Sequence, residues 1–243
     1  MTIRLFSDAP LQAHTTLSLP PAAARHAQVR RVQPGDVLVL FDGLGCDWPA
    51  EVLAMGRSEV RVQVGAPQPV QRELPHPVLL AVGMPANDRM DTLVEKATEL
   101  GAAAIQPLLC ERAVLRLDGE RALKKVAHWQ GVAVAASEQC GRARVPHIAP
   151  VLTLTAWLAG LARPDSAAPV GQRLLLSPQP GAAPLHGVPP GPLCVLSGPE
   201  GGLAPAEEAA ALAAGFHATG LGPRVLRADT APLALLAWVG LRG

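Results

Sequence analysis

The residues best suited to chemistry lie in two glycine-containing turns near the end of the chain. The first turn follows the apolar run Leu193–Leu196 and has the sequence SGPEGG, at residues 197–202. A short apolar run closed by small residues is typical of a buried parallel strand, and glycine permits positive φ and close approach of a ligand to the backbone. The second turn, at residues 221–230, has the sequence LGPRVLRADT. Ligands bind open α/β sheets where neighbouring strands end, so we expect the two turns to form one binding site.

The ligand expected in this site is not a phosphate. The first turn lacks the Lys-Ser/Thr ending of a Walker motif, and its glycines do not have the G-x-G-x-x-G spacing of dinucleotide sites. Glu200 would repel a phosphate and favours a ligand with cationic character. S-adenosylmethionine, which has a sulfonium and an ammonium group, is such a ligand. The alternative is that Glu200 only caps the helix that follows, which Pro205 begins and Gly215 ends.

The elements that must position these turns alternate between strand and helix from about residue 77 onward. Such alternation predicts a mostly parallel sheet with helices between its strands. The final helix is apolar on nearly every face, so we expect it to be buried, either in the core of its domain or against a second subunit. Expected strands are 78–82, 104–109 and 174–176, and expected helices are 88–100, 118–139, 205–215, 230–241 and a shorter one from Thr153 or Thr155.

The first part of the chain has a different pattern. Short strands are expected at residues 37–41, 51–54 and 60–64, with one helix beginning near Pro20 or Pro21. Many short strands with tight turns indicate a small barrel or sandwich. Prolines between residues 67 and 77 mark a linker to the next domain.

The composition limits the kinds of protein that the chain can be. The 243 residues are 49% hydrophobic, enough for a substantial core, and the net charge is only +1, so any nucleic-acid surface has to be a local patch. The four cysteines lack C-x-x-C spacing and the seven histidines are dispersed, so we expect reduced thiols and no metal site. The chain opens with no signal-peptide pattern, and its longest apolar run, 231–241, is too short to cross a bilayer. We therefore expect a soluble cytoplasmic protein with no membrane association.

Six segments together resemble one known family. They are RHAQVRRVQPGDVLVLFDG, EKATELGA, ERAVLRL, SEQCGR, SGPEGGL and LGPRVLRADTA, which occur in this order from the N-terminal part to the end of the chain. They are similar to segments of the bacterial ribosomal RNA uridine-N3 methyltransferases that modify small-subunit RNA, members of the SPOUT superfamily. The resemblance implies a PUA-like, RNA-binding β-barrel at residues 1–72. It also implies an α/β methyltransferase domain at residues 73–243, with a trefoil-knotted parallel sheet, helices on both faces, and assembly as a homodimer.

The activity implied is S-adenosylmethionine-dependent methylation of N3 of a specific uridine in 16S ribosomal RNA, either free or in the assembled small subunit. In this family three loops hold the cofactor mainly through backbone groups. They correspond here to Leu176, Ser177, Pro178, Leu196, Ser197, Gly198, Glu200, Gly201, Gly202, Leu221, Gly222, Val225, Leu226, Arg227 and Thr230.

RNA contact is expected mainly from basic residues. Arg25, His26 and Arg30 share one helix face, which could hold phosphates, although most such clusters are only solvated. Residues past a later helix end and a strand end could join them, because recognition residues tend to lie on loops. The full set is Arg25, His26, Arg30, Arg31, Arg112, Gln139 and Arg142.

Methylation at N3 requires an unpaired uracil and the loss of the N3 proton. Arg227 is our candidate for stabilising the deprotonated base, with a purely structural ion pair to Asp229 as the alternative. Asp229 is a candidate base. The family usually has Thr-Glu-Thr where this chain has Ala228-Asp229-Thr230, and often has a basic residue at the position of Ala86. The altered segment leaves open a non-catalytic RNA-binding protein that keeps the fold; a nucleotide-binding enzyme unrelated to RNA is a third alternative.

Overall fold

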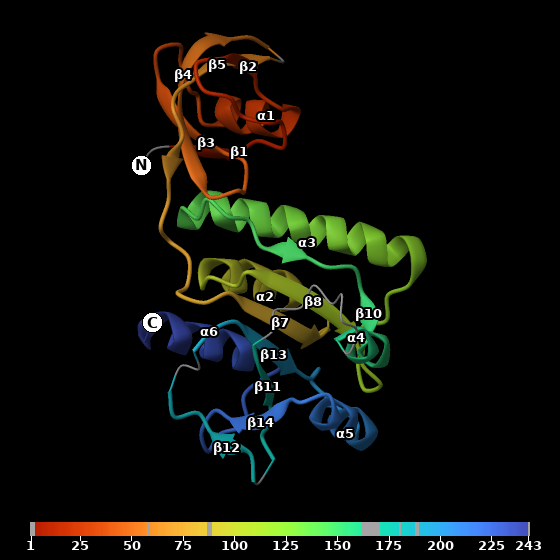
Figure 1. The fold of residues 1–243 in the computed structure, drawn as a ribbon. Helices are drawn as coiled ribbons and strands as arrows, with labels where there is room; N and C mark the ends of the chain where they lie inside the picture. Colours follow the sequence, from red (N-terminus) through yellow and green to blue (C-terminus); the bar gives the residue numbers. More distant parts are fainter. Residues whose placement is uncertain are drawn as a thin grey trace. The chain divides into compact units, whose positions relative to one another are not determined.

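The chain forms two compact units, each with its own sheet (Figure 1). The computed structural model describes residues 3–57, 59–86, 89–161, 171–179, 181–187 and 190–242. Unit 1 consists of Met1–Arg72 and Val134–Val145, and unit 2 consists of Glu73–Ala133 and Pro146–Gly243. The helix α3 (Gly119–Cys140) therefore contributes residues to both units.

The sheet of unit 1 is antiparallel except for the pairing of β1 with β3. Its strands alternate between buried and more exposed residues, so that Val60, Val62 and Val64 enter one hydrophobic core. The helix α1 (Pro21–Val29) has Pro21 in its first turn and buries three alanines in that core. The strands in spatial order are β1 (Arg4–Phe6), β3 (Val37–Phe41), β4 (Cys46–Met55), β5 (Val60–Val64) and β2 (Thr16–Ser18), with β6 (Gln68–Pro69) paired to β4.

The segment Val134–Val145 is bound to the rest of unit 1 by hydrogen bonds. The backbone N–H of Phe6 donates to Glu138 Oε1 at 2.9 Å, and that of Gly45 donates to the carbonyl oxygen of Ala143 at 2.9 Å. The Arg72 side chain donates to the Gly141 carbonyl. The end of α3 and the loop after it are thus part of this unit.

Unit 2 contains a sheet whose described strands all run in parallel. This confirms the parallel sheet that the strand–helix alternation predicts. The strand β13 lies between β7 and β11, two strands that are not its immediate neighbours in the chain. The spatial order is β10 (Leu152–Thr153), β8 (Ala104–Leu109), β7 (Val78–Gly83), β13 (Leu193–Ser197), β11 (Gln172–Leu176), β14 (His217–Gly220) and β12 (Ala183–Pro184), with β9 (His147–Ile148) paired to β8.

Helices cover both faces of this sheet (Figure 1). On one face α4 (Leu154–Leu161) and α5 (Pro205–Ala213) share a core with alternate strand residues such as Cys194 and Leu196. The helices α2 (Arg89–Glu99) and α6 (Thr230–Arg242) pack against each other, and α6 also contacts β13. Of the predicted helices, those near residues 88–100, 118–139, 205–215 and 230–241 are observed with small shifts at their ends.

The final helix is less completely buried than its sequence predicts. Leu235, Leu236 and Val239 lie in the interior, with at most 1% of their surface exposed. Leu241 is 86% exposed, and the Arg242 guanidinium carbon lies 5.6 Å from the centroid of the Trp238 ring. One face of α6 therefore packs in the core of unit 2, and another presents apolar side chains at the surface.

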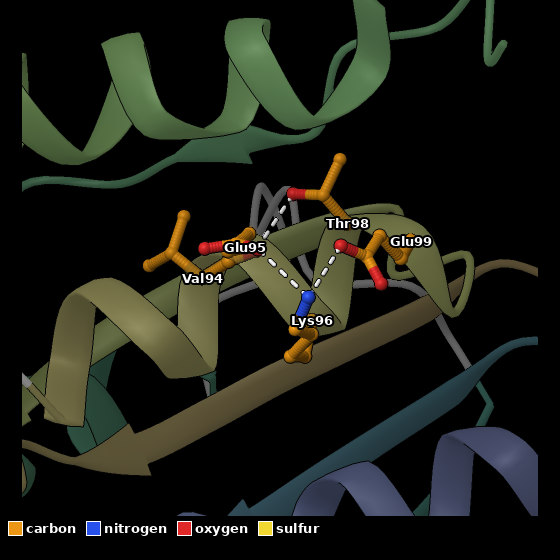
Figure 2. Close-up of polar contacts among 5 residues, drawn as sticks. All are labelled: Val94, Glu95, Lys96, Thr98 and Glu99. Atoms are coloured by element: carbon orange, nitrogen blue, oxygen red, sulfur yellow. Dashed lines mark hydrogen bonds and ion pairs between the residues drawn. The ribbon is translucent and has the colours of Figure 1, made fainter. Parts of the chain in front are cut away.

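The residues Glu95, Lys96 and Glu99 form the ion-pair network that their spacing on one helix predicts. Figure 2 shows Lys96 Nζ between Glu95 Oε1, at 2.7 Å, and Glu99 Oε1, at 2.8 Å. Hydrogen bonds to Glu95 and then to Glu99 raise the pKa of Lys96 above its ordinary value. Because all three side chains are in contact with solvent, the network stabilises α2 only slightly.

The described ranges contain neither a membrane-spanning helix nor a cluster of metal-binding side chains. No helix there is long and apolar enough to cross a membrane. The same ranges contain no group of three or more His, Cys, Asp or Glu side chains that could hold a metal ion.

Asp91 links α2 to α3 within unit 2. Its carboxylate accepts a hydrogen bond from Trp129 Nε1 at 2.9 Å, and its other oxygen lies 2.7 Å from His128 Nε2. Burial is the largest single influence and would raise the pKa of Asp91, but the hydrogen bonds and charges of His128, Trp129 and Lys125 together lower it. The ionised carboxylate is therefore the form that stabilises this contact.

We expect Asp91→Ala to lower the free energy of unfolding by about 1–3 kcal/mol, because it leaves the indole N–H of the buried Trp129 without a partner. The folded pKa is depressed, so the contribution is complete above the ordinary aspartate pKa of about 4 and is lost as the pH falls through the lower folded value. Urea titrations at pH 7 and pH 3 measure both effects. Glu120→Ala, which removes an exposed ion pair with Lys124 on the same helix, is the control and should change little.

Candidate functional site

A cavity of about 600 Å³ lies in unit 2 where β11, β13 and β14 end. Three loops at the carboxyl edge of the parallel sheet enclose it, which is where such sheets bind ligands. The lining residues are Arg89, Arg112, Leu175–Gln179, Ser197–Leu203, Glu208, Thr219, Leu221, Gly222, Arg224–Ala228 and Ala231.

The Gly-rich loop, residues Gly198–Leu203, follows β13 and forms one wall of the cavity. The N–H of Gly202 donates to the Pro199 carbonyl at 2.8 Å and closes a tight turn. Gly202 has φ +69°, and a Cβ atom there would meet no protein atom within 4 Å. A Cβ at Gly201 would instead lie 3.0 Å from Arg112 Cβ and 3.2 Å from the Arg112 carbonyl oxygen. The two glycines thus serve different ends: Gly202 keeps the cavity open, and Gly201 lets another loop pack closely.

Strand β7 supports the Gly-rich loop from beneath. A Cβ atom at Gly83, the last residue of β7, would lie 2.5 Å from Pro199 Cδ and 2.6 Å from Pro199 N. Because backbone is involved on both sides, no side chain fits there without displacing the loop. The position of the cavity wall therefore depends on the absence of a side chain at Gly83.

The two carboxylates that line the cavity have different partners. Glu200 accepts the backbone N–H of Ala86 at 2.9 Å and lies 3.5 Å from an Arg89 guanidinium nitrogen, so it joins the Gly-rich loop to the start of α2. It does not cap α5; Glu207 does, by accepting the N–H of Ala204 at 2.9 Å. Glu208 is half-buried, and one oxygen accepts a 3.4 Å hydrogen bond from the Ser177 hydroxyl. Glu208 is thus the carboxylate whose charge is less compensated inside the cavity.

Arg227 lines the cavity with an exposed side chain. Its carbonyl accepts the N–H groups of Thr230 and Ala231, each at 3.0 Å, and so begins α6. Among the described residues no ion pair joins Arg227 to Asp229. Asp229 is half-buried outside the cavity lining, and its buried Oδ1 has no hydrogen-bond partner within the described ranges. The guanidinium of Arg227 is therefore not held by the structural ion pair that the sequence left as an alternative.

Burial makes the two interior cysteines of unit 2 unsuited to nucleophilic chemistry. It raises the pKa of the Cys110 thiol to about 12, with a smaller contribution from the charge of Glu207. It raises that of Cys194 to about 12 as well. Both thiols are protonated at neutral pH and act as small core residues.

Most of the predicted cofactor residues lie together around the cavity. Leu196 is fully buried in the core, and Thr230 begins α6 without contributing to the lining. Sequence reasoning missed several residues that line the cavity. Two of them, Gln179 and Arg224, lie directly beside predicted loop residues, and this position was the available signal. The missed polar residues are Arg89, Gln179, Glu208, Thr219 and Arg224.

The predicted RNA-binding residues are divided between the units. Arg25, Arg30 and Arg31 are exposed on α1 and the turn after it, and Gln139 is exposed near the end of α3. His26 is partly exposed, with its Nδ1 3.4 Å from Glu138 Oε2. Arg112 lies in unit 2, at the cavity.

Arg142 requires a correction. The sequence predicts an exposed cluster past the end of α3, but Arg142 is only 3% exposed. Its carbonyl accepts a hydrogen bond at 3.2 Å from Arg4, a residue of β1 in unit 1. Because this segment is drawn into unit 1, its side chain lies below the surface that RNA would contact.

Comparison with known proteins agrees with this architecture. A family model described as the RNA methyltransferase domain matches residues 72–240, and one described as the RNA methyltransferase PUA domain matches residues 19–65. The ribosomal RNA small subunit methyltransferase E of Synechocystis sp. is 36% identical over 227 residues, covering 92% of this chain and 72% of the relative.

Two solved structures are also similar to the whole chain. The Neisseria gonorrhoeae ribosomal RNA small subunit methyltransferase E, bound to S-adenosyl methionine, has a TM-score of 0.88 and 33% identity, covering 98% of this chain and 96% of that one. A putative methyltransferase of Legionella pneumophila, in complex with the bound cofactor SAM, has a TM-score of 0.89 and 30% identity, with coverage of 98% and 97%. The fold is thus the SPOUT type preceded by a PUA-like domain. On these matches, the chain belongs to the family of the small-subunit ribosomal RNA methyltransferases E.

Proposed function

We propose that this chain is an S-adenosylmethionine-dependent methyltransferase that methylates N3 of a uridine in small-subunit ribosomal RNA. The observation that carries the proposal is the cavity itself, which the predicted cofactor loops line at the carboxyl edge of the sheet. The methyltransferase domain lies within residues 73–243, apart from the segment Val134–Val145, which belongs with residues 1–72 to the RNA-binding unit 1. The enzyme acts in the cytoplasm, where ribosomal RNA is found in bacteria, the source of the relatives described above.

The cavity fits S-adenosylmethionine in size, backbone and charge. Its volume of about 600 Å³ is in the range of ordinary cofactor sites. Gly202 and Gly222, both with positive φ, have open space where a side chain would stand, so a ligand can approach the backbone there. The half-buried carboxylate of Glu208 suits a ligand that carries positive charge.

The bound cofactor supplies a methyl group that its sulfonium already activates. The chain itself has to orient an unpaired uracil and to manage the N3 proton, since N3 loses this proton when it takes the methyl group. Arg227, exposed at the cavity wall, stabilises the negative charge of the deprotonated base. Asp229, two residues after Arg227 and next to the cavity-lining Ala228, is the proposed acceptor of that proton.

RNA is held by exposed arginines of unit 1. Arg25, Arg30 and Arg31 are exposed and can contact phosphates without sequence preference. The net charge of +1 makes this cluster, not the whole protein, the source of attraction for RNA.

The protein acts as a homodimer through α6. Leu241, 86% exposed, and the half-buried Trp238 lie on one side of this helix and give it an apolar surface. Burial of such a surface against a second copy would remove it from water. We also propose that the loops that enclose the cavity form the trefoil knot of the family.

The first prediction tests the cofactor site. Gly202→Val should abolish binding of S-adenosylmethionine in calorimetry, because a β-branched residue resists φ +69° and its side chain would enter the open space of the cavity. Gly215→Val is a matched control: Gly215 has φ +84° and open space as well, but it lies outside the cavity. The control should lose stability and keep cofactor affinity. A folded Gly202→Val protein with wild-type affinity would exclude this loop as the cofactor site.

The second prediction tests the reaction and separates two roles of arginine. With wild-type protein, single-turnover transfer to small-subunit RNA should yield N3-methyluridine, identified by mass mapping. Arg227→Ala should lower the single-turnover rate by about 100-fold or more, the usual cost of losing one charge-stabilising group. Arg30→Ala should leave that rate nearly unchanged at saturating RNA, but weaken RNA affinity and reduce its salt slope by roughly 0.7–0.9. A wild-type rate for Arg227→Ala would show that this residue does not act on the base.

The third prediction tests assembly. The wild-type protein should sediment as a dimer at micromolar concentration, and Leu241→Glu should sediment as a folded monomer, because a charge cannot be buried there without a partner. Leu241 is 86% exposed, so its replacement does not disturb the core of unit 2. Leu123→Glu, at another exposed leucine (66%), should remain dimeric. A wild-type monomer with full methyl-transfer activity contradicts the proposal.

A further inference from the structure

The loop that follows β8 is attached to the Gly-rich loop by side chains from both directions. From this β8 loop, residues Cys110–Asp118, Arg112 Nη1 donates to the carbonyl oxygens of Gly201, at 3.3 Å, and Leu203, at 3.4 Å. In return, Glu207 at the start of α5 accepts the backbone N–H of Glu111 at 2.8 Å. Arg112 thus contacts the backbone of the Gly-rich loop, and Glu207, in the helix that follows this loop, contacts the backbone of the β8 loop.

The packing of the two loops leaves no room for a side chain between them. A Cβ at Gly201 would lie 3.0 Å from Arg112 Cβ and 3.2 Å from its carbonyl oxygen, so it would require the β8 loop to shift by a few tenths of an ångström. The same Glu207 carboxylate also holds the first turn of α5, through the N–H of Ala204 at 2.9 Å. The close approach at Gly201 and the two side chains therefore fix one geometry of the Gly-rich loop.

This loop needs external support because of its composition. It contains Gly198, Gly201 and Gly202, and glycine loses more conformational freedom on ordering than any other residue. A ligand that must itself order a loop binds more weakly than one that meets a loop already in place. Both loop carbonyls accept from one guanidinium nitrogen at 3.3 and 3.4 Å, and the positive charge of the donor strengthens these long contacts.

We propose that Arg112 and Glu207 form a reciprocal clamp that holds the Gly-rich loop in its cofactor-binding shape. Arg112 is then a residue that positions the cofactor loop. The sequence instead predicted a contact between Arg112 and RNA. The inference rests on the proposed binding of S-adenosylmethionine in the cavity, and it adds the β8 loop to the structure on which that binding depends.

The test measures the affinity of S-adenosylmethionine by calorimetry for wild type, Arg112→Ala, Glu207→Gln and the double variant, with folding checked by circular dichroism. Each single variant should weaken binding by about tenfold, equivalent to about 1.4 kcal/mol. The double variant should lose much less than the product of the two single losses, because both act on one clamp. Arg121→Ala removes an exposed charge on α3 that does not line the cavity, and its cofactor affinity should equal that of wild type.

Kinetics separate positioning from RNA contact. Arg112→Ala should raise KM for S-adenosylmethionine and leave kcat at saturating cofactor, and the salt slope of RNA binding, unchanged. A reduced salt slope with normal cofactor affinity would overturn the clamp and make Arg112 a phosphate contact. Fully multiplicative losses in the double variant would also overturn it. If wild-type protein does not bind S-adenosylmethionine, the proposed function fails, an outcome distinct from equal binding by wild type and Arg112→Ala, which contradicts the clamp alone.

Discussion

The site depends on where β13 lies in the parallel sheet. This strand is buried along its length and pairs with β7 on one edge and β11 on the other. Its carboxyl end therefore places the Gly-rich loop between the ends of β7 and β11, two strands that are far apart in the sequence. The loops after β11 and β14 complete the cavity beside it. Because sheet hydrogen bonds fix these strand ends, backbone atoms can define much of the cavity wall.

Close backbone contact is the second requirement of this arrangement. At Gly83 the end of β7 touches Pro199, and at Gly201 the Gly-rich loop touches Arg112. A methyl group at either position would meet backbone or Cβ atoms at 3.0 Å or less. The glycines of this region thus act by packing in some places and by φ in others, and their sequence alone does not distinguish the two.

Much of unit 2 could be predicted because its signals are local. Apolar runs such as Leu193–Leu196 and Val78–Val82 have the length and composition of buried strands, and the helix ends are marked by Pro205 and Gly215. The order of strands could not be predicted in this way, since it depends on contacts between distant segments. The family resemblance implied a trefoil-knotted parallel sheet without the order of its strands, and the loops that line the cavity were assigned from the resemblance.

The errors concern residues whose surroundings come from elsewhere in the chain. Arg142 follows a helix end, and local pattern places such a residue on the surface; its segment instead belongs to unit 1, where Arg142 is only 3% exposed. The capping role left open for Glu200 is wrong as well: Glu207 caps α5, whereas Glu200 lines the cavity and joins Ala86 and Arg89 to the Gly-rich loop. Strand β4 extends to Cys46–Met55, well beyond the predicted 51–54, because Pro49 is accommodated within its pairing with β3.

The division of the chain into two units limits which segments can be exchanged between related proteins during evolution. Segment Val134–Val145 belongs to unit 1, although the residues immediately before and after it belong to unit 2. Donors on Phe6, Gly45 and Arg72 depend on acceptors in that segment, and donors without partners are costly where they are buried. A recombination event that exchanged only the first 72 residues between relatives would have to match these acceptors as well. Residues 1–72 are thus not exchangeable on their own. We expect substitutions at Phe6, Gly45 and Arg72 and at the end of α3 to occur together during evolution.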